Sequence, residues 1–406
     1  MSKYRGYENV LQEQLKDLIA SDKPIILFGV KMAGLIGKKT LDFLGKKVVC
    51  FCDNDKAKQG TVVDRLEVLS PKQGKEKYPD AKVYICLLNN DNIKQVKVQL
   101  EGLGFNDIFN KDVLFYVYQI QVIKRPVTSS DLADTMDVLN NNEGKLIMSD
   151  VVLFITEQCT LNCKECSALV PYIKKPINYP KNIIIEGIQR LSQSVDAVMT
   201  INILGGEPLL HQDIVEICAE VSKLKNVLLV RVVTNGTILP DNDILSKLKT
   251  IGTCIHISDY GELSINKGKL IEVLAAHKMI YELAGERALW YPVSPPQKSG
   301  RSYEENITFF SNCEWSRKCP ELQNGELHIC GYSASGTALG VIPSRDGDYV
   351  NVLDPSLSTN EIRQKIDKLL NHTNCITACD YCGFDFTRTT VRAAQANGKL
   401  DLQSEE

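Results

Sequence analysis

Short apolar runs alternate with longer segments of helical periodicity along the first 110 residues. Such alternation predicts strands and helices that follow one another as βα units. The expected strands are 24–30, 47–52, 83–88 and 107–109, and the expected helices are 8–20, 38–44 and 92–103. Strands that alternate with helices in this way favour an α/β fold with a parallel sheet.

The same alternation resumes after residue 150. Strands are expected at 151–156, 199–204, 227–233, 253–257 and 278–283, with helices at 181–195, 211–224, 241–249 and 265–276. Five or six such units predict a partial barrel, because a closed eight-fold barrel needs about 250 residues or more. Between the two patterns, apolar residues 113–122 predict a packing helix, and polar residues 131–142 predict a loop.

A loop with three glycines follows the first strand, at Gly29, Gly34 and Gly37, and Asp53 follows the second strand. Strand, glycine loop, helix, strand and acid is the order of a dinucleotide-binding βαβ unit. The spacing here is G-x4-G-x2-G, which departs from the usual G-x-G-x-x-G.

This region resembles the small Rossmann-like domains at the N-termini of sugar- and polysaccharide-tailoring enzymes. The matching stretches are the FG loop, the FCDND strand end, the Leu69-Ser70-Pro71 turn and the VYICLLNN strand. The resemblance implies a nucleotide or nucleotide-sugar site, with the glycine loop near phosphate and Asp53 near a ribose hydroxyl. The alternative is a docking domain whose glycines only permit close packing of helix on strand.

Bulk composition narrows the class of protein. The chain has 406 residues, 44% hydrophobic and 24% charged, and a net charge of −3. Its length predicts two or three domains, and the absence of a basic block argues against nucleic-acid or membrane partners. The N-terminus lacks the apolar core of a signal peptide, and no apolar run approaches the roughly 20 residues that span a bilayer. We therefore expect a cytoplasmic protein.

Fourteen cysteines in a reducing compartment need an explanation other than disulfides. Five lie in apolar strand or helix patterns and are expected to be buried small hydrophobes: Cys50, Cys52, Cys86, Cys218 and Cys254. The other nine fall in two clusters typical of metal ligands: Cys159, Cys163 and Cys166, then Cys313, Cys319, Cys330, Cys375, Cys379 and Cys382.

The first cluster follows the expected strand 151–156, at the strand end where α/β enzymes place their chemistry. Three thiolates are one short of the four that hold an ordinary 4Fe–4S cluster, so one iron would stay open. The alternative is structural zinc, which needs a fourth ligand nearby. Position 167 is serine, and His211 is distant in sequence.

Over about residues 150–390 the chain resembles the radical S-adenosylmethionine (SAM) enzymes. Three motifs carry the resemblance, in the family's order: C-x3-C-x2-C at Cys159, Cys163 and Cys166; GGEP at Gly205, Gly206, Glu207 and Pro208; and TNG at Thr234, Asn235 and Gly236. His256 and Ser258 match the family's ribose-contacting position more loosely. Glu165 departs from the family, which usually has an aromatic residue or histidine there.

The resemblance implies a 4Fe–4S cluster on the three thiols, with SAM bound at the open iron and at the other two motifs. Reductive cleavage of SAM would give methionine and a 5′-deoxyadenosyl radical that abstracts hydrogen from a substrate. A flavodoxin- or ferredoxin-type protein is the expected electron donor.

The second cysteine cluster has the spacing of SPASM and twitch extensions, which carry auxiliary 4Fe–4S clusters. Asn324-Gly325 predicts a hairpin turn, so Cys319 and Cys330 would face one another. We expect one auxiliary cluster, held by four of Cys313, Cys319, Cys330, Cys379 and Cys382; the alternative is a zinc knot. A spare thiol, Cys313 or Cys375, could donate hydrogen to a substrate radical, as radical epimerases require.

The predicted organisation has five parts: a Rossmann-like domain (1–125), a connector (126–148), a radical SAM partial barrel (149–305), a twitch-like domain (306–388) and a tail (389–406). The tail predicts one short helix at 390–397 and a frayed end. The expected substrate is a sugar, a nucleotide sugar or a polyol, oxidised or epimerised at a carbinol carbon. The alternatives are maturation of a ribosomal peptide and, more remotely, a non-catalytic iron–sulfur assembly or binding protein.

Overall fold

The computed structural model describes residues 5–284, 290–293, 295–313, 315–316, 319–371, 374–385 and 387–401. The chain divides into two compact units, Met1–Glu143 and Gly144–Glu406. No helix in the described ranges has the length and apolar character needed to cross a membrane.

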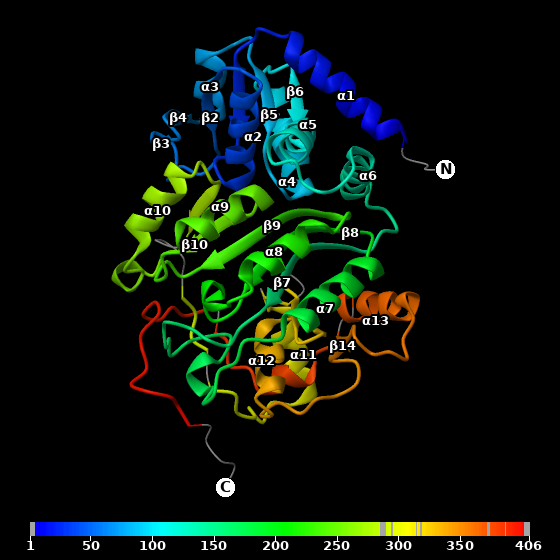
Figure 1. Ribbon diagram of the computed structural model, residues 1–406, viewed down its shortest axis with the longest axis vertical. Coiled ribbons are helices and arrows are strands. Elements are labelled where there is room, and N and C mark those ends of the chain that lie inside the picture. Colours follow the sequence, from blue (N-terminus) through cyan, green and yellow to red (C-terminus); the bar gives the residue numbers. More distant parts are fainter. Residues whose placement is uncertain are drawn as a thin grey trace. The chain divides into compact units, whose positions relative to one another are not determined.

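The first unit is built on a six-stranded sheet in the order β3-β4-β2-β1-β5-β6 (Figure 1). Its strands are β1 (Ile25–Phe28), β2 (Val48–Cys52), β3 (Val62–Val63), β4 (Leu66–Leu69), β5 (Lys82–Ile85) and β6 (Ile108–Asn110). Its helices are α1 (Arg5–Ala20), α2 (Met32–Phe43), α3 (Pro71–Lys77), α4 (Asn90–Gly102), α5 (Asp112–Val117) and α6 (Ser129–Asn140). All neighbouring strands are parallel except β3 and β4, which confirms the predicted βα pattern.

Helix α2 begins at Met32, where the glycine spacing predicts a loop that extends to Gly37. The two later glycines lie inside this helix and allow it to approach the sheet closely. A Cβ atom on Gly34 would lie 1.9 Å from the Gly29 carbonyl oxygen, and one on Gly37 would lie 3.0 Å from Cys86 Sγ. Helix α2 starts earlier than predicted because Gly34 and Gly37 belong to the helix, where they allow close packing on the sheet. The loop before it is correspondingly short.

Replacing Gly34 by alanine is expected to destabilise the first unit. The added methyl group would overlap the Gly29 carbonyl, and overpacking of this kind typically costs about 1–3 kcal/mol. Calorimetric unfolding of the full chain measures the effect. Gly102→Ala is the matched control, because a Cβ at this other helical glycine meets nothing within 4 Å. Equal unfolding temperatures for the two variants would contradict the packing role of Gly34.

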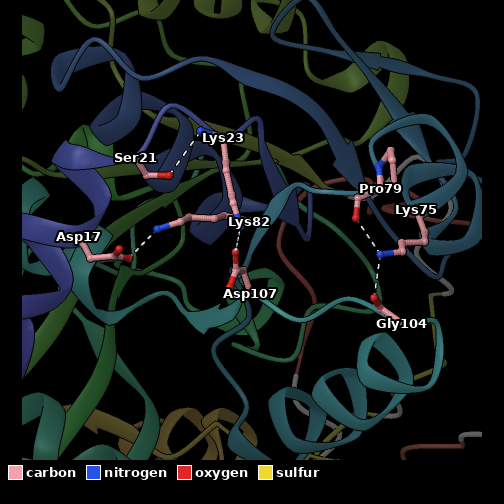
Figure 2. Close-up of polar contacts among 8 residues, drawn as sticks. All are labelled: Asp17, Ser21, Lys23, Lys75, Pro79, Lys82, Gly104 and Asp107. Carbon is pink, nitrogen blue, oxygen red and sulfur yellow. Dashed lines mark hydrogen bonds and ion pairs between the residues drawn. The ribbon is translucent and has the colours of Figure 1, made fainter.

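Charged side chains link α1 to the amino-terminal ends of the strands (Figure 2). The buried Lys82 Nζ lies 2.5 Å from a carboxylate oxygen of Asp17 and 5.4 Å from the centroid of the Phe109 ring. Lys23 pairs with Asp107 at 2.6 Å. These charges are matched within the unit, so this edge of the sheet has a structural role.

Residues 131–142, predicted as a loop, lie mostly in helix α6, which packs against α1. The Thr128 hydroxyl accepts a hydrogen bond from the Asp131 N–H at 3.0 Å and caps the helix. Asn140 donates to the Tyr7 hydroxyl at 2.8 Å. The predicted packing helix at 113–122 is confirmed as α5 followed by a π-helical turn at Tyr118–Val122. The helix was not predicted because the composition of residues 131–142 is mostly polar, although the helix has an N-cap and one apolar face.

The second unit is built on an eight-stranded sheet in the order β11-β10-β9-β8-β7-β12-β13-β14 (Figure 1). Its strands are β7 (Ile147–Phe154), β8 (Ala197–Leu204), β9 (Val227–Thr234), β10 (Cys254–Ser258), β11 (Tyr281–Ala284), β12 (Glu321–Gln323), β13 (Glu326–His328) and β14 (Tyr349–Asn351). Its helices are α7 (Lys181–Ser194), α8 (Ile214–Ser222), α9 (Asn242–Ile251), α10 (Lys267–Ala276), α11 (Tyr303–Ser311), α12 (Gly331–Ala338) and α13 (Thr359–Asn371).

Strands β7 to β11 are parallel, as the partial-barrel prediction requires, and the sheet stays open. The hairpin β12–β13 extends it, because β12 pairs in parallel with β7. Asn324 and Gly325 form the turn with φ angles of 49° and 83°, which confirms the hairpin prediction. The barrel sheet and the cysteine-bearing hairpin are therefore one continuous structure.

Candidate active site

The three motifs of the second unit lie at the ends of three adjacent parallel strands. The cysteine loop follows β7, the GGEP segment follows β8, and the TNG segment includes the end of β9. Phe154 of β7 pairs with Leu204 of β8, and Ile203 of β8 pairs with Val232 of β9. Parallel pairing in this register brings all three motifs to one edge of the sheet.

Gly205 and Gly206 hold the GGEP segment against the start of the cysteine loop. A Cβ on Gly205 would lie 2.4 Å from the Thr156 carbonyl oxygen, and one on Gly206 would lie 2.3 Å from the Gln158 carbonyl oxygen. The Gly206 N–H donates to Thr156 O and the Glu207 N–H donates to Gln158 O, both at 2.8 Å. In this structure the glycines therefore serve the contact between two loops of the protein.

Glu207 ties the GGEP segment to the TNG segment. Its side chain is fully buried and accepts hydrogen bonds from the Asn235 N–H at 2.8 Å, the Thr234 hydroxyl at 3.0 Å and the Leu209 N–H at 3.1 Å. Burial raises the pKa of this carboxyl group to about 7, and the three donors act in the opposite direction. Glu207 thus fixes the relative position of the β8 and β9 loops.

Asn235 links the TNG segment to the cysteine loop. Its amide nitrogen donates to the Thr160 hydroxyl oxygen at 3.1 Å and lies 3.7 Å from Cys159 Sγ. The Thr160 and Thr237 hydroxyl oxygens are 2.5 Å apart. All three motifs therefore form a single hydrogen-bonded assembly around Cys159.

The three thiols of the cysteine loop suit an iron–sulfur cluster. Burial raises the pKa of Cys159 to about 12 and that of Cys163 to about 11, and the neighbouring thiols of the triplet raise both further. The sulfurs are thus close enough to interact, and binding to iron would displace their protons. No three His, Cys, Asp or Glu side chains in the described ranges converge on a single metal ion. A cluster differs from a single ion because each thiolate binds a different iron.

The tail, predicted as a helix at 390–397 with a frayed end, is an extended strap over the cysteine loop as far as residue 401. The Lys164 N–H donates to Ala394 O at 2.7 Å, the Ala396 N–H to Asn162 O at 2.8 Å and the Leu400 N–H to Pro171 O at 2.8 Å. These partners in the loop replace the hydrogen bonds of a helix. Residues 402–406 lie outside the described residues.

One strap side chain contacts a candidate iron ligand directly. Gln395 donates through Nε2 to Cys163 Sγ at 3.3 Å and accepts from the Asn162 N–H at 2.7 Å. Hydrogen bonds to cysteine sulfur are one of the factors that set cluster reduction potentials.

Gln395→Leu is expected to lower the midpoint potential of the reconstituted cluster, because the N–H···S bond stabilises electron density on sulfur. A net hydrogen bond of about 1 kcal/mol corresponds to about 40 mV for one electron. Potentiometry followed by electron paramagnetic resonance measures the shift. Gln395→Glu, which removes the donor and adds a negative charge, should shift the potential further in the same direction. A potential unchanged in both variants would exclude this role.

A cavity of about 230 Å³ adjoins the cysteine loop and the end of β10. Its lining includes Ser167, His256, Ser258, Tyr260, Trp290 and Arg392. Two of these, His256 and Ser258, are the loosely matched ribose-contacting candidates. At the departure position, the Glu165 carboxylate accepts a hydrogen bond from the Val293 N–H at 2.5 Å. Glu165 therefore anchors a segment of the cavity wall, a role that its position in the motif does not indicate.

In the part of the chain that the structure describes, three other C-terminal cysteines interact electrostatically with Cys330. Burial raises the pKa of Cys330 well above its usual value, and Cys382, Cys379 and Cys313 raise it further. The pKa of Cys379 is raised by burial and further by Cys382, Cys375 and Cys313, and that of Cys382 is raised by burial and further by Cys313. Cys319 is partly buried and packs against the apolar core of the barrel. The mutual effects of these thiols on one another's pKa thus favour Cys313, Cys330, Cys379 and Cys382 as one set of four ligands.

Arg301 supports this four-cysteine group. Its guanidinium donates to the carbonyl oxygens of Cys379 and Cys382, the latter at 2.7 Å, and its Nε donates to Asn306 Oδ1 at 3.0 Å. The sixth cysteine, Cys375, has its pKa raised by burial and by Asp348 and Asp380, and it interacts electrostatically with Cys379. No sequence motif singled out Arg301.

In the first unit, the candidate nucleotide-binding residues have partners within the protein. The Gly29 N–H donates to Cys52 O at 2.7 Å. The Asp53 carboxylate accepts from the Asp55 N–H at 2.9 Å and from Lys58 Nζ at 3.2 Å. Gly34 and Gly37 pack inside α2. The nucleotide site and the docking alternative both stay predictions.

The roles of Arg392, Gln395 and Glu165 were not predicted from the sequence. Arg392 and Gln395 lie outside any recognisable motif, in a segment whose composition predicts a helix. Glu165 lies inside the three-cysteine motif, but the motif does not indicate its contact with Val293. One indication in the sequence is the short distance between Cys382 and the tail, which keeps the tail near the candidate metal ligands.

Comparison with known proteins identifies the central part of this unit. Residues 153–258 match the model of the Radical SAM superfamily. GTP 3′,8-cyclase of Stenotrophomonas maltophilia is 33% identical over 90 residues, which are 22% of this chain and 27% of that protein. Molybdenum cofactor biosynthesis protein 1 of Dictyostelium discoideum is 30% identical over 135 residues, 31% of this chain and 21% of that protein. The matches therefore span about a quarter of these curated relatives.

Among solved structures, BtrN in complex with AdoMet and 2-DOIA is similar with a TM-score of 0.43 and 16% identity. The alignment covers 61% of this chain and 97% of BtrN. Because this TM-score is below 0.5, the similarity to BtrN carries no argument here. The resemblance to the radical SAM superfamily rests on the family match and on the geometry of the three motifs.

Proposed function

We propose that this chain, whose residues 153–258 belong to the radical SAM superfamily, cleaves SAM and abstracts hydrogen from a small-molecule substrate. The observation that carries the proposal is the convergence of the cysteine loop, Gly206 and Asn235 at one sheet edge. A 4Fe–4S cluster held by the three thiols would supply the electron for reductive cleavage of SAM.

The chain's own residues position and enclose the reactants. Glu207 and the two glycines hold the three loops in one arrangement, which limits the motion that would misplace SAM. Aromatic side chains of the adjoining cavity, including Tyr260 and Trp290, would keep water from a reactive radical.

The substrate we propose is a sugar, a nucleotide sugar or a related polyol, oxidised at a carbinol carbon. The N-terminal resemblance supports this class, and the imidazole of His256 and the hydroxyl of Ser258 give the cavity groups that can hydrogen-bond to hydroxyls. Oxidation is favoured over epimerisation because neither Cys313 nor Cys375 is among the residues that line the cavity. Among the described residues that line the cavity, none carries a thiol that could return a hydrogen atom.

Two-electron oxidation of the carbinol removes one hydrogen atom, then one proton and one electron. The four-cysteine group of Cys313, Cys330, Cys379 and Cys382 would hold an auxiliary cluster as the acceptor of that last electron. A flavodoxin- or ferredoxin-type protein would supply the electron for SAM cleavage.

Anaerobically reconstituted protein should release 5′-deoxyadenosine from SAM under dithionite. Nucleotide sugars and sugar phosphates should stimulate that release, and a substrate deuterated at the carbinol carbon should transfer deuterium to 5′-deoxyadenosine. Stimulation by a precursor peptide alone would favour peptide maturation. Protein that holds iron but releases no 5′-deoxyadenosine would overturn the proposal in favour of an assembly or binding role.

A further inference from the structure

The cavity beside the cysteine loop contains two donor groups that have no acceptor. Trp290 Nε1 and Arg392 Nε are buried, and neither has a hydrogen-bond partner among the described residues. An indole N–H and a guanidinium can only donate. Buried donors without acceptors cost free energy, and a ligand that supplies acceptor oxygens would recover it.

Both donor residues contact the same aromatic ring, that of Tyr260. The Arg392 guanidinium lies over the ring of Tyr260, 5.0 Å from its centroid. Trp290 packs edge-on to the same ring, with centroids 5.6 Å apart and an interplanar angle of 86°. The two unmet donors therefore belong to the same wall of the cavity.

The charge of this wall is positive. The lining residues include Arg392 and no aspartate or glutamate. The carboxylate next to Tyr260 in sequence, Asp259, accepts from Lys267 Nζ at 2.7 Å and from the Gly261 N–H at 2.8 Å. Asp259 is thus hydrogen-bonded and ion-paired to Lys267, and Arg392 is only near enough to help lower the pKa of Asp259. No ion pair to Arg392 occurs in the part of the chain that the structure describes.

Arg392 reaches the cavity because the strap is held in place on either side of it. The Thr390 N–H donates to Trp290 O at 2.8 Å, which ties the strap to the segment that carries the second donor. On the other side, Ala394 O accepts from the Lys164 N–H of the cysteine loop. These backbone hydrogen bonds hold the main chain on either side of Arg392, and the guanidinium lies over the ring of Tyr260.

We propose that Arg392 and the Trp290 indole N–H receive an anionic oxygen group of the substrate, a phosphate or a carboxylate. This inference rests on the proposed function and narrows its substrate class. A guanidinium can bind such a group through two parallel hydrogen bonds. Sugar phosphates and nucleotide sugars carry the required group, whereas a neutral polyol does not. The carboxylate of SAM has the same chemistry and is the second source to be tested.

The test compares a sugar with and without phosphate. Glucose and glucose 1-phosphate are titrated into cluster-loaded, full-length enzyme saturated with SAM, and binding is measured calorimetrically. Wild-type enzyme should bind glucose 1-phosphate at least about tenfold more tightly than glucose, and inorganic phosphate should compete. Arg392→Met should remove the difference, Arg392→Lys should restore part of it, and Trp290→Phe should reduce it severalfold. Arg388→Met is the matched control, because Arg388 lies on the same segment and pairs with Asp385 at 2.5 Å.

Two outcomes would overturn the inference: no phosphate preference in the wild type, or an unchanged preference in Arg392→Met with its iron content intact. A separate titration with SAM distinguishes the two sources. If Arg392→Met weakens SAM binding about tenfold and the sugar-phosphate preference persists, the group bound is the SAM carboxylate and the substrate assignment fails. These readouts need no turnover, so phosphate binding through Arg392 without release of 5′-deoxyadenosine would contradict the proposed function alone.

Discussion

Simultaneous replacement of Cys159, Cys163 and Cys166 by alanine is expected to abolish release of 5′-deoxyadenosine and to halve the iron content. The three thiols lie in the loop that contacts the GGEP and TNG segments, and Cys163 and Cys166 are the cysteines among the described residues that raise the pKa of Cys159. A cluster there and one at the four-cysteine group contain about eight irons together, so the variant should retain about four. Anaerobic iron and sulfide analysis with chromatography of the SAM products measures both effects.

Single replacements of the C-terminal cysteines test which of them bind the auxiliary cluster. Cys319→Ala and Cys375→Ala should keep the full iron content, because neither thiol is among the cysteines that raise the pKa of Cys330. Cys330→Ala should lose about four irons. An iron content near twelve in the wild type would require two auxiliary clusters and would contradict a single set of four ligands.

Gly206→Ala is expected to slow SAM cleavage by about a hundredfold while leaving most of the iron bound. The new methyl group would lie 2.3 Å from Gln158 O and 2.7 Å from Cys159 Cβ, which is closer than non-bonded atoms approach. The cysteine loop must then shift by about an ångström relative to the GGEP segment, and displacements of this size can cost about 10² in rate. Single-turnover release of 5′-deoxyadenosine under dithionite measures the rate.

Gly268→Ala provides the matched control for that experiment. Gly268 lies in α10 of the same unit, and a Cβ there would meet nothing within 4 Å. Its cleavage rate should equal that of the wild type. A Gly206→Ala rate within twofold of this control would show that the loop contact can relax without displacing the cysteines.

Local pattern was sufficient to predict most elements of both sheets. Strands β7 to β10 are short apolar runs bounded by polar residues, so their positions follow from burial of a parallel sheet. The turn at Asn324-Gly325 follows from the positive φ angles that those residue types adopt. The order of the three motifs then follows from the order of the strands.

Segments without a strong local preference were predicted less well. Helix α6 was missed because its polar face outweighs its apolar face in composition. Helix α2 was expected to start later because glycine usually favours a loop, whereas Gly34 and Gly37 are needed inside the helix for contact with the sheet. In both cases packing on a distant element outweighed local propensity.

The sequence alone indicated the candidate site, because a three-cysteine motif, a glycine pair and the TNG segment follow successive predicted strands. Parallel pairing of those strands makes their convergence almost unavoidable. The strap, the division of the C-terminal cysteines and the unmet donors of Trp290 and Arg392 depend instead on contacts between residues far apart in sequence. These contacts depend on hydrogen-bond partners in distant segments of the chain, so no local sequence pattern predicts them.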